Sequence, residues 1–119
     1  MYHVDNAVMP THLWEGMTIR DLTPEGVTWG ASFIEIDVPP GCVHPLARSS
    51  RCEAFYYCER GQFEFVVANN TFQVGPGDLV EVKANEWYGY SNKTSESARL
   101  LNFDVPPYAA SALEYQKSE

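Results

Sequence analysis

The residues with the clearest potential for chemistry are tyrosines and carboxylates in the middle of the chain. Tyr56 and Tyr88 carry phenols, which donate protons or hydrogen bonds at neutral pH because the ordinary pKa of tyrosine is near 10. Glu35 and Glu53 offer carboxylates that can accept a proton. A phenol acting as general acid beside a carboxylate base supports isomerisation, dehydration or cyclisation, and nothing in the sequence selects among these reactions.

A second group of residues has the donor atoms of a metal site. Cys42, His44, Cys52 and Glu53 lie within twelve residues of one another, but their spacing matches no common zinc pattern. We keep a metal site built from these four residues as an alternative. The chain has three cysteines, and this odd number, with no export signal in view, favours reduced thiols.

The charge balance restricts the partners of the chain. Acidic residues outnumber basic ones 16 to 8, which gives a formal net charge of −8. Such a surface repels nucleic acid and anionic membranes on average. Residues 1–10 do not show the pattern of a signal peptide, which is a basic start followed by an apolar stretch. No apolar run approaches the roughly 20 residues that span a bilayer. We therefore expect a cytoplasmic protein without nucleic-acid or membrane partners.

The elements that must position these residues are short strands. Turn signals recur at short intervals, and the runs between them are rich in β-branched and aromatic residues, a pattern typical of β-sandwiches and barrels. We expect one domain over residues 1–119. Its parts are an N-terminal arm (1–16), a barrel (17–107) and, after Pro106-Pro107, a short helix or tail (108–119).

Two stretches carry a recognisable spacing of residues. In the first, Gly41 is followed by Ala47 and Ser49, then Ala54, then Gly61. In the second, Gly77 is followed by Lys83, Asn85, Tyr88 and Asn92. These spacings resemble the two motifs of the cupin family. In those motifs the positions of Ala47, Ser49 and Ala54 hold His, His and Glu, and the position of Tyr88 holds a third His.

The resemblance implies a cupin-type antiparallel β-barrel, also called a double-stranded β-helix or jelly roll. The four family ligands bind a divalent transition metal inside that barrel. Alanine has no donor atom, a serine hydroxyl is a weak ligand, and a phenol must first lose its proton. We therefore predict that the usual metal site is lost and that the protein uses no cofactor.

Alternation along the strands predicts the lining of the barrel. If the four ligand positions face inward, residues two apart on the same strands face inward too. The predicted lining is Ala47, Ser49, Ala54, Tyr56, Cys58, Tyr88 and Tyr90. Phe33 and Glu35, or their neighbours, are expected to join it from the preceding strand. The same parity turns His44 away from the interior, toward the surface or a subunit interface, unless the chain bulges at Pro45.

An aromatic, hydroxyl-bearing lining suits a ring-shaped organic ligand. Arg48 and Arg51 would favour an anionic group on that ligand if they faced the mouth of the barrel. We therefore predict a metal-independent cupin that binds a small molecule and acts as an isomerase, lyase or cyclase. The alternatives are a non-catalytic binding or sensing cupin, and a metal-dependent cupin with relocated ligands. The resemblance also implies a homodimer.

Overall fold

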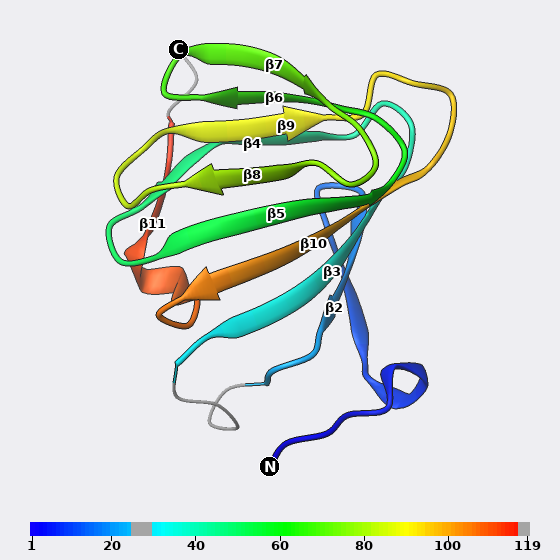
Figure 1. The fold of residues 1–119 in the computed structure, drawn as a ribbon, viewed down its shortest axis with the longest axis vertical. Helices are drawn as coiled ribbons and strands as arrows, with labels where there is room; N and C mark the ends of the chain where they lie inside the picture. The colour runs from blue at the N-terminus through cyan, green and yellow to red at the C-terminus, as the bar shows by residue number, and fades with distance from the viewer. Residues whose placement is uncertain (25–29, 117–119) are drawn as a thin grey trace.

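The fold consists of two antiparallel sheets that face each other, as Figure 1 shows in a computed structural model that describes residues 1–24 and 30–116. The six-stranded sheet contains, in spatial order, β1 (Thr11–Trp14), β2 (Met17–Asp21), β3 (Ser32–Val38), β10 (Ala98–Val105), β5 (Glu53–Arg60) and β8 (Leu79–Val82). The five-stranded sheet contains β11 (Leu113–Tyr115), β4 (Val43–Ser49), β9 (Tyr88–Ser91), β6 (Phe63–Val67) and β7 (Asn70–Val74). The predicted all-β, jelly-roll-like architecture is confirmed.

Two details of the predicted fold are wrong. The sheets are separate hydrogen-bonded ladders and do not close into a barrel. The expected C-terminal helix is a single 3-10 turn, η2 (Ala110–Ala112), followed by β11, which pairs with β4. Pairing with the edge of an existing sheet satisfies the backbone of this segment, whereas an isolated helix of that length is unstable in water.

The expected N-terminal arm is partly built into the sheet. Its first residues include a 3-10 turn, η1 (Asn6–Val8), and β1 then forms a hairpin with β2. Glu15 and Gly16 both have positive φ, 51° and 81°, as a two-residue hairpin turn requires. Within residues 1–24 and 30–116 no helix has the length and apolar character needed to cross a membrane.

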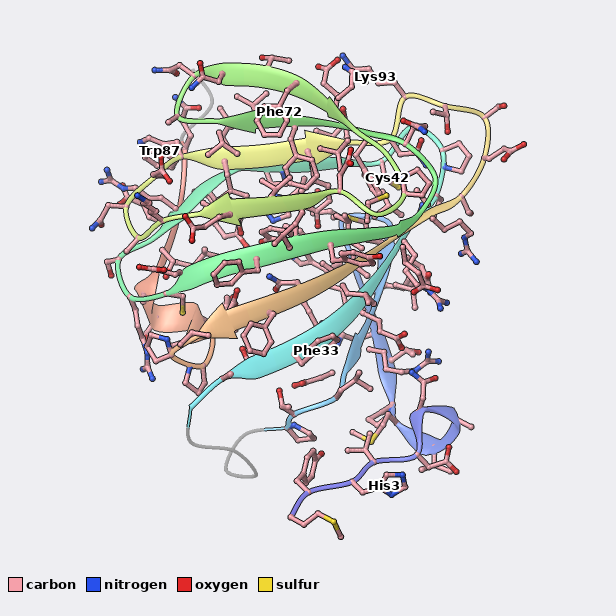
Figure 2. The ribbon with its side chains drawn as sticks, in the orientation of Figure 1. His3, Phe33, Cys42, Phe72, Trp87 and Lys93 are labelled. Atoms are coloured by element: carbon pink, nitrogen blue, oxygen red, sulfur yellow. The ribbon has the colours of Figure 1, made fainter. Side chains whose placement is uncertain are left out.

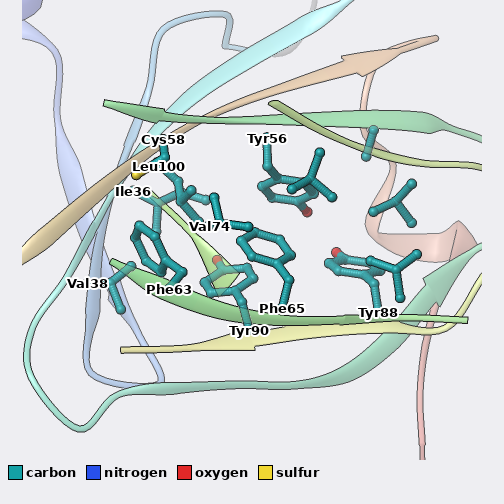
Figure 3. Packing of buried hydrophobic residues seen from close by; sticks show 14 of the residues in the cluster. Ile36, Val38, Tyr56, Cys58, Phe63, Phe65, Val74, Tyr88, Tyr90 and Leu100 are labelled. Atoms are coloured by element: carbon teal, nitrogen blue, oxygen red, sulfur yellow. The ribbon is translucent and has the colours of Figure 1, made fainter. Parts of the chain in front are cut away.

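The core lies between the two sheets, where alternate residues of facing strands meet (Figure 3). On β6, Phe63 and Phe65 are buried while the residues between them are partly exposed. On β10, Ala98 and Leu100 are fully buried and begin a row that continues toward the end of the strand. This two-residue period is that of a sheet packed on one face.

The motif residues that the sequence singled out hold turns. Gly61 has a φ of 86°, and a Cβ atom there would lie 2.4 Å from the Cβ atom of Ala98. Asn92 is fully buried and its amide bridges three segments: Nδ2 donates to the carbonyls of Val38 at 2.9 Å and Glu96 at 2.7 Å. Its Oδ1 accepts from the backbone and hydroxyl of Thr94. These contacts close the loop between β9 and β10.

Replacing Asn92 by alanine removes the donor to the carbonyl of the buried Val38, and it also removes the bonds to Glu96 and Thr94 in the exposed loop. We expect Asn92→Ala to lower the free energy of unfolding by about 2 kcal/mol, because an unsatisfied buried carbonyl costs on the order of 1 kcal/mol or more and the lost loop bonds add to this. Urea unfolding measures the change. Asn70→Ala is the control, since Asn70 is exposed and its one bond to Ala68 is 3.4 Å long. Equal effects of the two substitutions would contradict this role.

Candidate functional site

A bulge in β4 determines which of its residues enter the interior. His44 pairs with Tyr90 and Ala47 pairs with Tyr88, so two residues on β4 stand opposite the single Gly89 on β9. The extra residue lets both His44 and Ala47 face inward, and both are buried. A Cβ atom on Gly89 would lie 2.9 Å from the carbonyl oxygen of His44, so the close approach at the bulge requires glycine there.

The prediction that His44 points outward is therefore wrong. The chain bulges at Pro45, which is the condition under which we expected His44 to face inward. The imidazole packs among the rings of Trp14 (4.9 Å between centroids), Tyr88 (5.1 Å) and Tyr90 (4.8 Å). Its Nδ1 lies 2.6 Å from the carbonyl oxygen of Pro45. A carbonyl only accepts, so Nδ1 carries the proton and Nε2 keeps its lone pair. Burial lowers the pKa of His44 to about 4, and the ring is neutral at pH 7.

Three tyrosines from facing sheets meet between the strands (Figure 3). Tyr56, from β5, lies with its ring centroid 5.6 Å from that of Tyr88 and 5.8 Å from that of Tyr90, both from β9. Burial raises the pKa of all three phenols well above the ordinary value. Each of these two phenols also acts on the pKa of the other: Tyr88 raises the pKa of Tyr56, and Tyr56 lowers that of Tyr88, in both cases by less than burial raises it. All three stay protonated at neutral pH.

A buried carboxylate completes the group, and the sequence analysis missed it. Asp104, near the end of β10, is 5% exposed and accepts a hydrogen bond from Asn102 Nδ2 at 3.0 Å. Burial raises its pKa to about 6, and the bond from Asn102 opposes the shift. Asp104 pairs across the sheet with Ala54, the position where the cupin motif has glutamate. The carboxylate therefore comes from the neighbouring strand. The alternation Ala98, Leu100, Asn102, Asp104 is the signal that could have revealed it.

Further phenols lie between this group and the surface. The charge of Asp104 raises the pKa of Tyr56, Tyr88 and Tyr108, in each case adding to the larger effect of burial. Tyr108 and Tyr115 are half-exposed, and Tyr115 packs 6.0 Å from Trp14. We use the name interior cluster for His44, Tyr56, Tyr88, Tyr90, Asn102 and Asp104. Trp14, Tyr108 and Tyr115 lie around the cluster.

Several predicted site residues lie elsewhere. Phe33 and Glu35 were expected to line the interior, but their neighbours Ile34 and Ile36 face inward in their place. Phe33 lies on the outer face of the six-stranded sheet (Figure 2), and Glu35 forms ion pairs with Arg20 and Arg99. Glu53 is exposed at the start of β5 because the next residue, Ala54, is the one that faces inward. Strand alternation thus places these carboxylates outside the interior cluster.

Of the remaining predicted residues, some are buried between the sheets and others lie at turns or on the surface. Ala47, Ala54 and Cys58 are buried, but the Cys58 thiol lies at the turn, where it contacts the carbonyls of Arg60 and Gly61. Ser49 Oγ accepts bonds from the backbone of residues 51 and 52 at the end of β4. The Arg48 guanidinium pairs with Glu114 at 2.9 Å and stacks 4.6 Å from the centre of Trp87. Arg51 is exposed.

The residues at the family's ligand positions do not fit a metal ion. Ala47 and Ala54 have no donor atom, the Ser49 hydroxyl is engaged in the turn, and Tyr88 keeps its proton. The relocated alternative also lacks support, because Cys52 Sγ contacts the carbonyl of Pro107 while Glu53 is exposed. Within residues 1–24 and 30–116 no three His, Cys, Asp or Glu side chains gather as ligands.

The opposite pKa shifts of Asp104 and His44 predict opposite effects of pH on stability. The carboxyl pKa is higher in the folded state, about 6 against 3.8, so its stabilising contribution is complete below pH 3.8 and is lost as the pH rises through 6. The imidazole pKa is lower in the folded state, about 4 against 6.5, so its contribution is complete above pH 6.5 and is lost as the pH falls through 4. Between pH 4 and 6 the two effects oppose each other.

We expect Asp104→Asn to increase the free energy of unfolding at pH 7.5 by up to roughly 3 kcal/mol, since one pKa unit corresponds to about 1.4 kcal/mol. The gain over the unsubstituted protein should shrink as the pH falls from 6 to 4. Urea unfolding across this range measures it. Glu81→Gln, at an exposed carboxyl of β8, should change stability by less than about 0.5 kcal/mol at every pH. A pH-independent effect of Asp104→Asn would refute the assigned shift.

Comparison with solved structures shows the fold. The nucleoside dehydratase Pac13 of Streptomyces superposes with a TM-score of 0.84 at 17% identity, over 98% of this chain and 92% of that chain. The polyketide cyclase RemF of Streptomyces resistomycificus gives 0.80 at 21% identity, over 100% and 87%. A predicted oxalate decarboxylase of Thermotoga maritima gives 0.80 at 14%, over 87% and 98%. Pac13 variants with a His-to-Gln or a Tyr-to-Phe substitution have been solved with uridine.

Comparison of sequences identifies the family. No curated protein matches the chain significantly. The family model described as the cupin domain matches residues 34–104, from β3 to the buried Asp104 on β10. This match covers more than half of the chain, and it includes both motif stretches and the whole interior cluster. The chain belongs to the cupin domain family.

Proposed function

We propose that this cupin binds an uncharged, ring-containing organic molecule between its sheets and catalyses an acid–base reaction on it without a metal. The observation that carries the proposal is the position of Asp104, a buried carboxyl with a pKa of about 6, in the same interior cluster as the protonated phenols of Tyr56 and Tyr88. Groups whose environments give them different protonation states at one pH are suited to opposite roles in proton transfer.

Asp104 takes the role of the base. At pH 7 most of this carboxyl is ionised, and its raised pKa makes it a stronger base than an exposed aspartate. It accepts a proton from a carbon next to a carbonyl group. The electron pair of the broken C–H bond moves to the carbonyl oxygen, giving an enolate. Asp104 replaces Glu53, the carboxylate expected from the sequence, because Glu53 is exposed on the outer side of β5.

Tyr88 and Tyr56 stabilise the oxygen that gains charge. Burial keeps both phenols protonated at neutral pH, so each has a proton to donate to the substrate oxygen. Where a C=C bond is conjugated with the enolate, the far carbon of that bond takes the proton back from Asp104 while the double bond moves toward the carbonyl group, which is an isomerisation. Alternatively it expels a neighbouring hydroxyl group with a proton from the carboxyl, which is a dehydration. Both routes restore the starting protonation of the protein.

His44 orients the substrate. Because Nδ1–H is held by the carbonyl of Pro45, Nε2 accepts a hydrogen bond from a hydroxyl or N–H group of the ligand. With a pKa of about 4 the ring adds no positive charge. Trp14, Tyr88 and Tyr90, which pack on the imidazole, offer aromatic faces to a planar ring.

The charges around the interior cluster favour an uncharged ligand. Its ionisable members are a neutral imidazole, protonated phenols and an ionised carboxyl, and a buried anion without a cation is strongly disfavoured. Arg48 pairs with Glu114, so the expected anion contact is not supported. The nucleoside dehydratase Pac13, solved with uridine, and the polyketide cyclase RemF support a ring-containing ligand by analogy of fold.

A non-catalytic binding cupin is the second candidate. The contacts among Tyr56, Tyr88, Tyr90 and Phe65 favour it, because packed rings bind a flat ligand without any proton transfer. The cytoplasmic location and the homodimer remain proposals that rest on the sequence.

Proton transfer and binding can be tested in one set of samples. The protein is incubated in heavy water with uridine, uridine monophosphate and a panel of uncharged ring ketones. NMR detects both saturation transfer to the ligand and deuterium incorporation at carbon. We expect an uncharged member to bind, the monophosphate to bind at least about tenfold more weakly, and exchange to exceed the protein-free rate by about 100-fold or more.

Matched variants separate the roles. Asp104→Asn should reduce exchange by about 100-fold with binding retained, and Tyr88→Phe should reduce it by about tenfold. Tyr57→Phe removes an exposed phenol from the outer face of β5 and should change neither. Binding without exchange would favour the non-catalytic candidate. Tighter binding of the monophosphate than of uridine would refute the uncharged ligand.

The donor set also predicts the metal content. Protein purified without chelators or metal-affinity columns should contain less than about 0.1 transition-metal ion per chain, and a chelator should shift Tm by less than about 1 °C, because a tightly bound ion would stabilise the folded state. Elemental analysis and thermal unfolding measure the two quantities. One metal per chain would refute the metal-independent mechanism.

A further inference from the structure

Asn102 is a buried amide whose two partners are both acceptors. It lies on the inner side of β10, two residues before Asp104, and it is 6% exposed. Its Nδ2 lies 3.2 Å from the carbonyl oxygen of Phe55 and 3.0 Å from Oδ1 of Asp104. A carbonyl and a carboxylate only accept hydrogen bonds, so the nitrogen of the amide, and not its oxygen, faces them. Both N–H groups of Asn102 are therefore engaged.

The bond to Phe55 ties this amide to the sheet. Phe55 belongs to β5, which pairs with β10 on one side and with β8 on the other. A backbone carbonyl between two paired strands has little freedom to move, and a side chain that is bonded to it is locked in one orientation. The second N–H group of Asn102 therefore meets the carboxyl of Asp104 from a fixed direction.

Asp104 forms no ion pair with a Lys, Arg or His within residues 1–24 and 30–116. The titratable groups that its charge affects are Tyr56 on β5, Tyr88 on β9, Cys52 just before β5 and Tyr108 after β10. Burial raises the pKa of each of the four, so all of them are neutral at pH 7. The Asn102 amide is therefore the group that favours the charged form of Asp104.

The amide makes the two oxygens of the carboxyl different. Oδ1 accepts the N–H group of Asn102, and among the described residues no hydrogen bond to Oδ2 occurs. A donor that is bonded to one oxygen stabilises the negative charge there, so a proton binds more readily to the other oxygen. The proton-accepting atom of Asp104 is therefore Oδ2.

We propose that Asn102 is a positioning residue for the base: its amide, anchored on the carbonyl of Phe55, occupies Oδ1 of Asp104 and directs Oδ2 toward the substrate carbon. This inference rests on the proposed function, to which the base role of Asp104 belongs. The C–H bond of the substrate breaks, the proton bonds to Oδ2, and the electron pair moves to the substrate carbonyl oxygen. Oδ1 accepts the amide before and after the transfer. Asn102 itself touches no reacting atom.

An uncharged amide is suited to this position because its effect is moderate. Burial raises the pKa of Asp104 to about 6, and the bond from Asn102 opposes this shift. A cation in the same place would favour the carboxylate more strongly and make it a weaker base. Without any donor, a larger share of the carboxyl would be protonated at neutral pH. A general base works best when its pKa lies near the working pH.

The titration of Asp104 tests the proposal without a substrate. NMR follows its labelled carboxyl carbon in the full chain, and the signal is assigned by its absence from Asp104→Asn. Asn102→Leu removes both donors at similar volume and should raise the titration midpoint by at least about one pH unit. Val74→Ala is the control, because Val74 is a buried residue of β7 outside the interior cluster, and its loss should lower stability without moving the midpoint. An unchanged midpoint in Asn102→Leu would overturn the proposal.

Deuterium exchange into cyclohexanone, an uncharged ring ketone, gives a second readout. At pH 6, the midpoint of Asp104, Asn102→Leu should slow the exchange at least about fivefold, and the difference should narrow as the pH rises, because the altered base ionises at higher pH. In the Asp104→Asn background, Asn102→Leu should change the remaining exchange by less than about twofold, since it acts through Asp104.

The two readouts separate this inference from the proposed function. Exchange that keeps the same pH profile in Asn102→Leu would overturn the role of Asn102 and leave the proposed function in place. No exchange by the unsubstituted protein at any pH would refute the proposed function, and the titration would still decide whether Asn102 acts on Asp104.

A measurement on the unsubstituted protein keeps the test valid if Asn102→Leu fails to fold. The NMR signal of one Nδ2 proton of Asn102 should move downfield with the midpoint of the Asp104 carboxyl carbon, because an ionised carboxyl accepts a stronger hydrogen bond. Asn92 is the matched control, since its Nδ2 donates to the carbonyls of Val38 and Glu96, which do not titrate. Asn102 protons that do not follow Asp104 would contradict the proposed contact.

Discussion

The packing of the two sheets' inner faces is the interaction on which the other features depend. Phe63, Phe65 and Leu100 fill the space between the sheets and exclude water from it. The same exclusion acts on the polar groups beside them. Burial lowers the pKa of His44 because the charged imidazolium loses its solvation. Burial raises the pKa of Asp104 because the charged carboxylate also loses its solvation. Burial alone thus explains both the neutral imidazole of His44 and the raised pKa of the Asp104 carboxyl.

The interior cluster shows how a cupin scaffold can keep its backbone path while changing its chemistry. The turns at Gly61 and Asn92 hold the strands, and their requirements are steric or depend on buried hydrogen bonds. Ala54 leaves room beside β10, and Asp104 supplies a carboxylate from the adjacent strand. A buried carboxyl and protonated phenols therefore lie in the part of the fold where the family motifs place a metal-binding donor set.

The two faces of the six-stranded sheet carry different kinds of side chain. Its inner face carries Tyr56 and Asp104, and its outer face carries Phe55 and Phe103 on the same two strands. Strict alternation separates them, so a substitution on one face leaves the other face's side chains in place. The interior cluster and the apolar side chains on the outer face share a backbone but not their contacts.

Composition, turn spacing and the two glycine-framed motifs were sufficient to predict an all-β cupin and the loss of the family's ligands. These features are local, because a motif is a run of residue types at defined distances along one chain segment. Alternation also predicted that Tyr56, Tyr88 and Tyr90 all point inward, and they are buried together between the sheets. It failed at His44 because one extra residue in β4 shifts the register, and at Phe33 because the parity of β3 was assigned to the wrong face.

Only the tertiary structure decided the rest. The proximity of Asp104 to the tyrosines depends on the pairing of β10 with β5, which brings Asp104 beside Ala54, 50 residues earlier in the chain. Residues 113–115 form a strand because they pair with the edge of β4, and the local sequence does not show that this edge is available. Sequence by itself determined the residue types and their local geometry. Long-range pairing decided which of them meet, because contacts between distant segments form only when the sheets assemble.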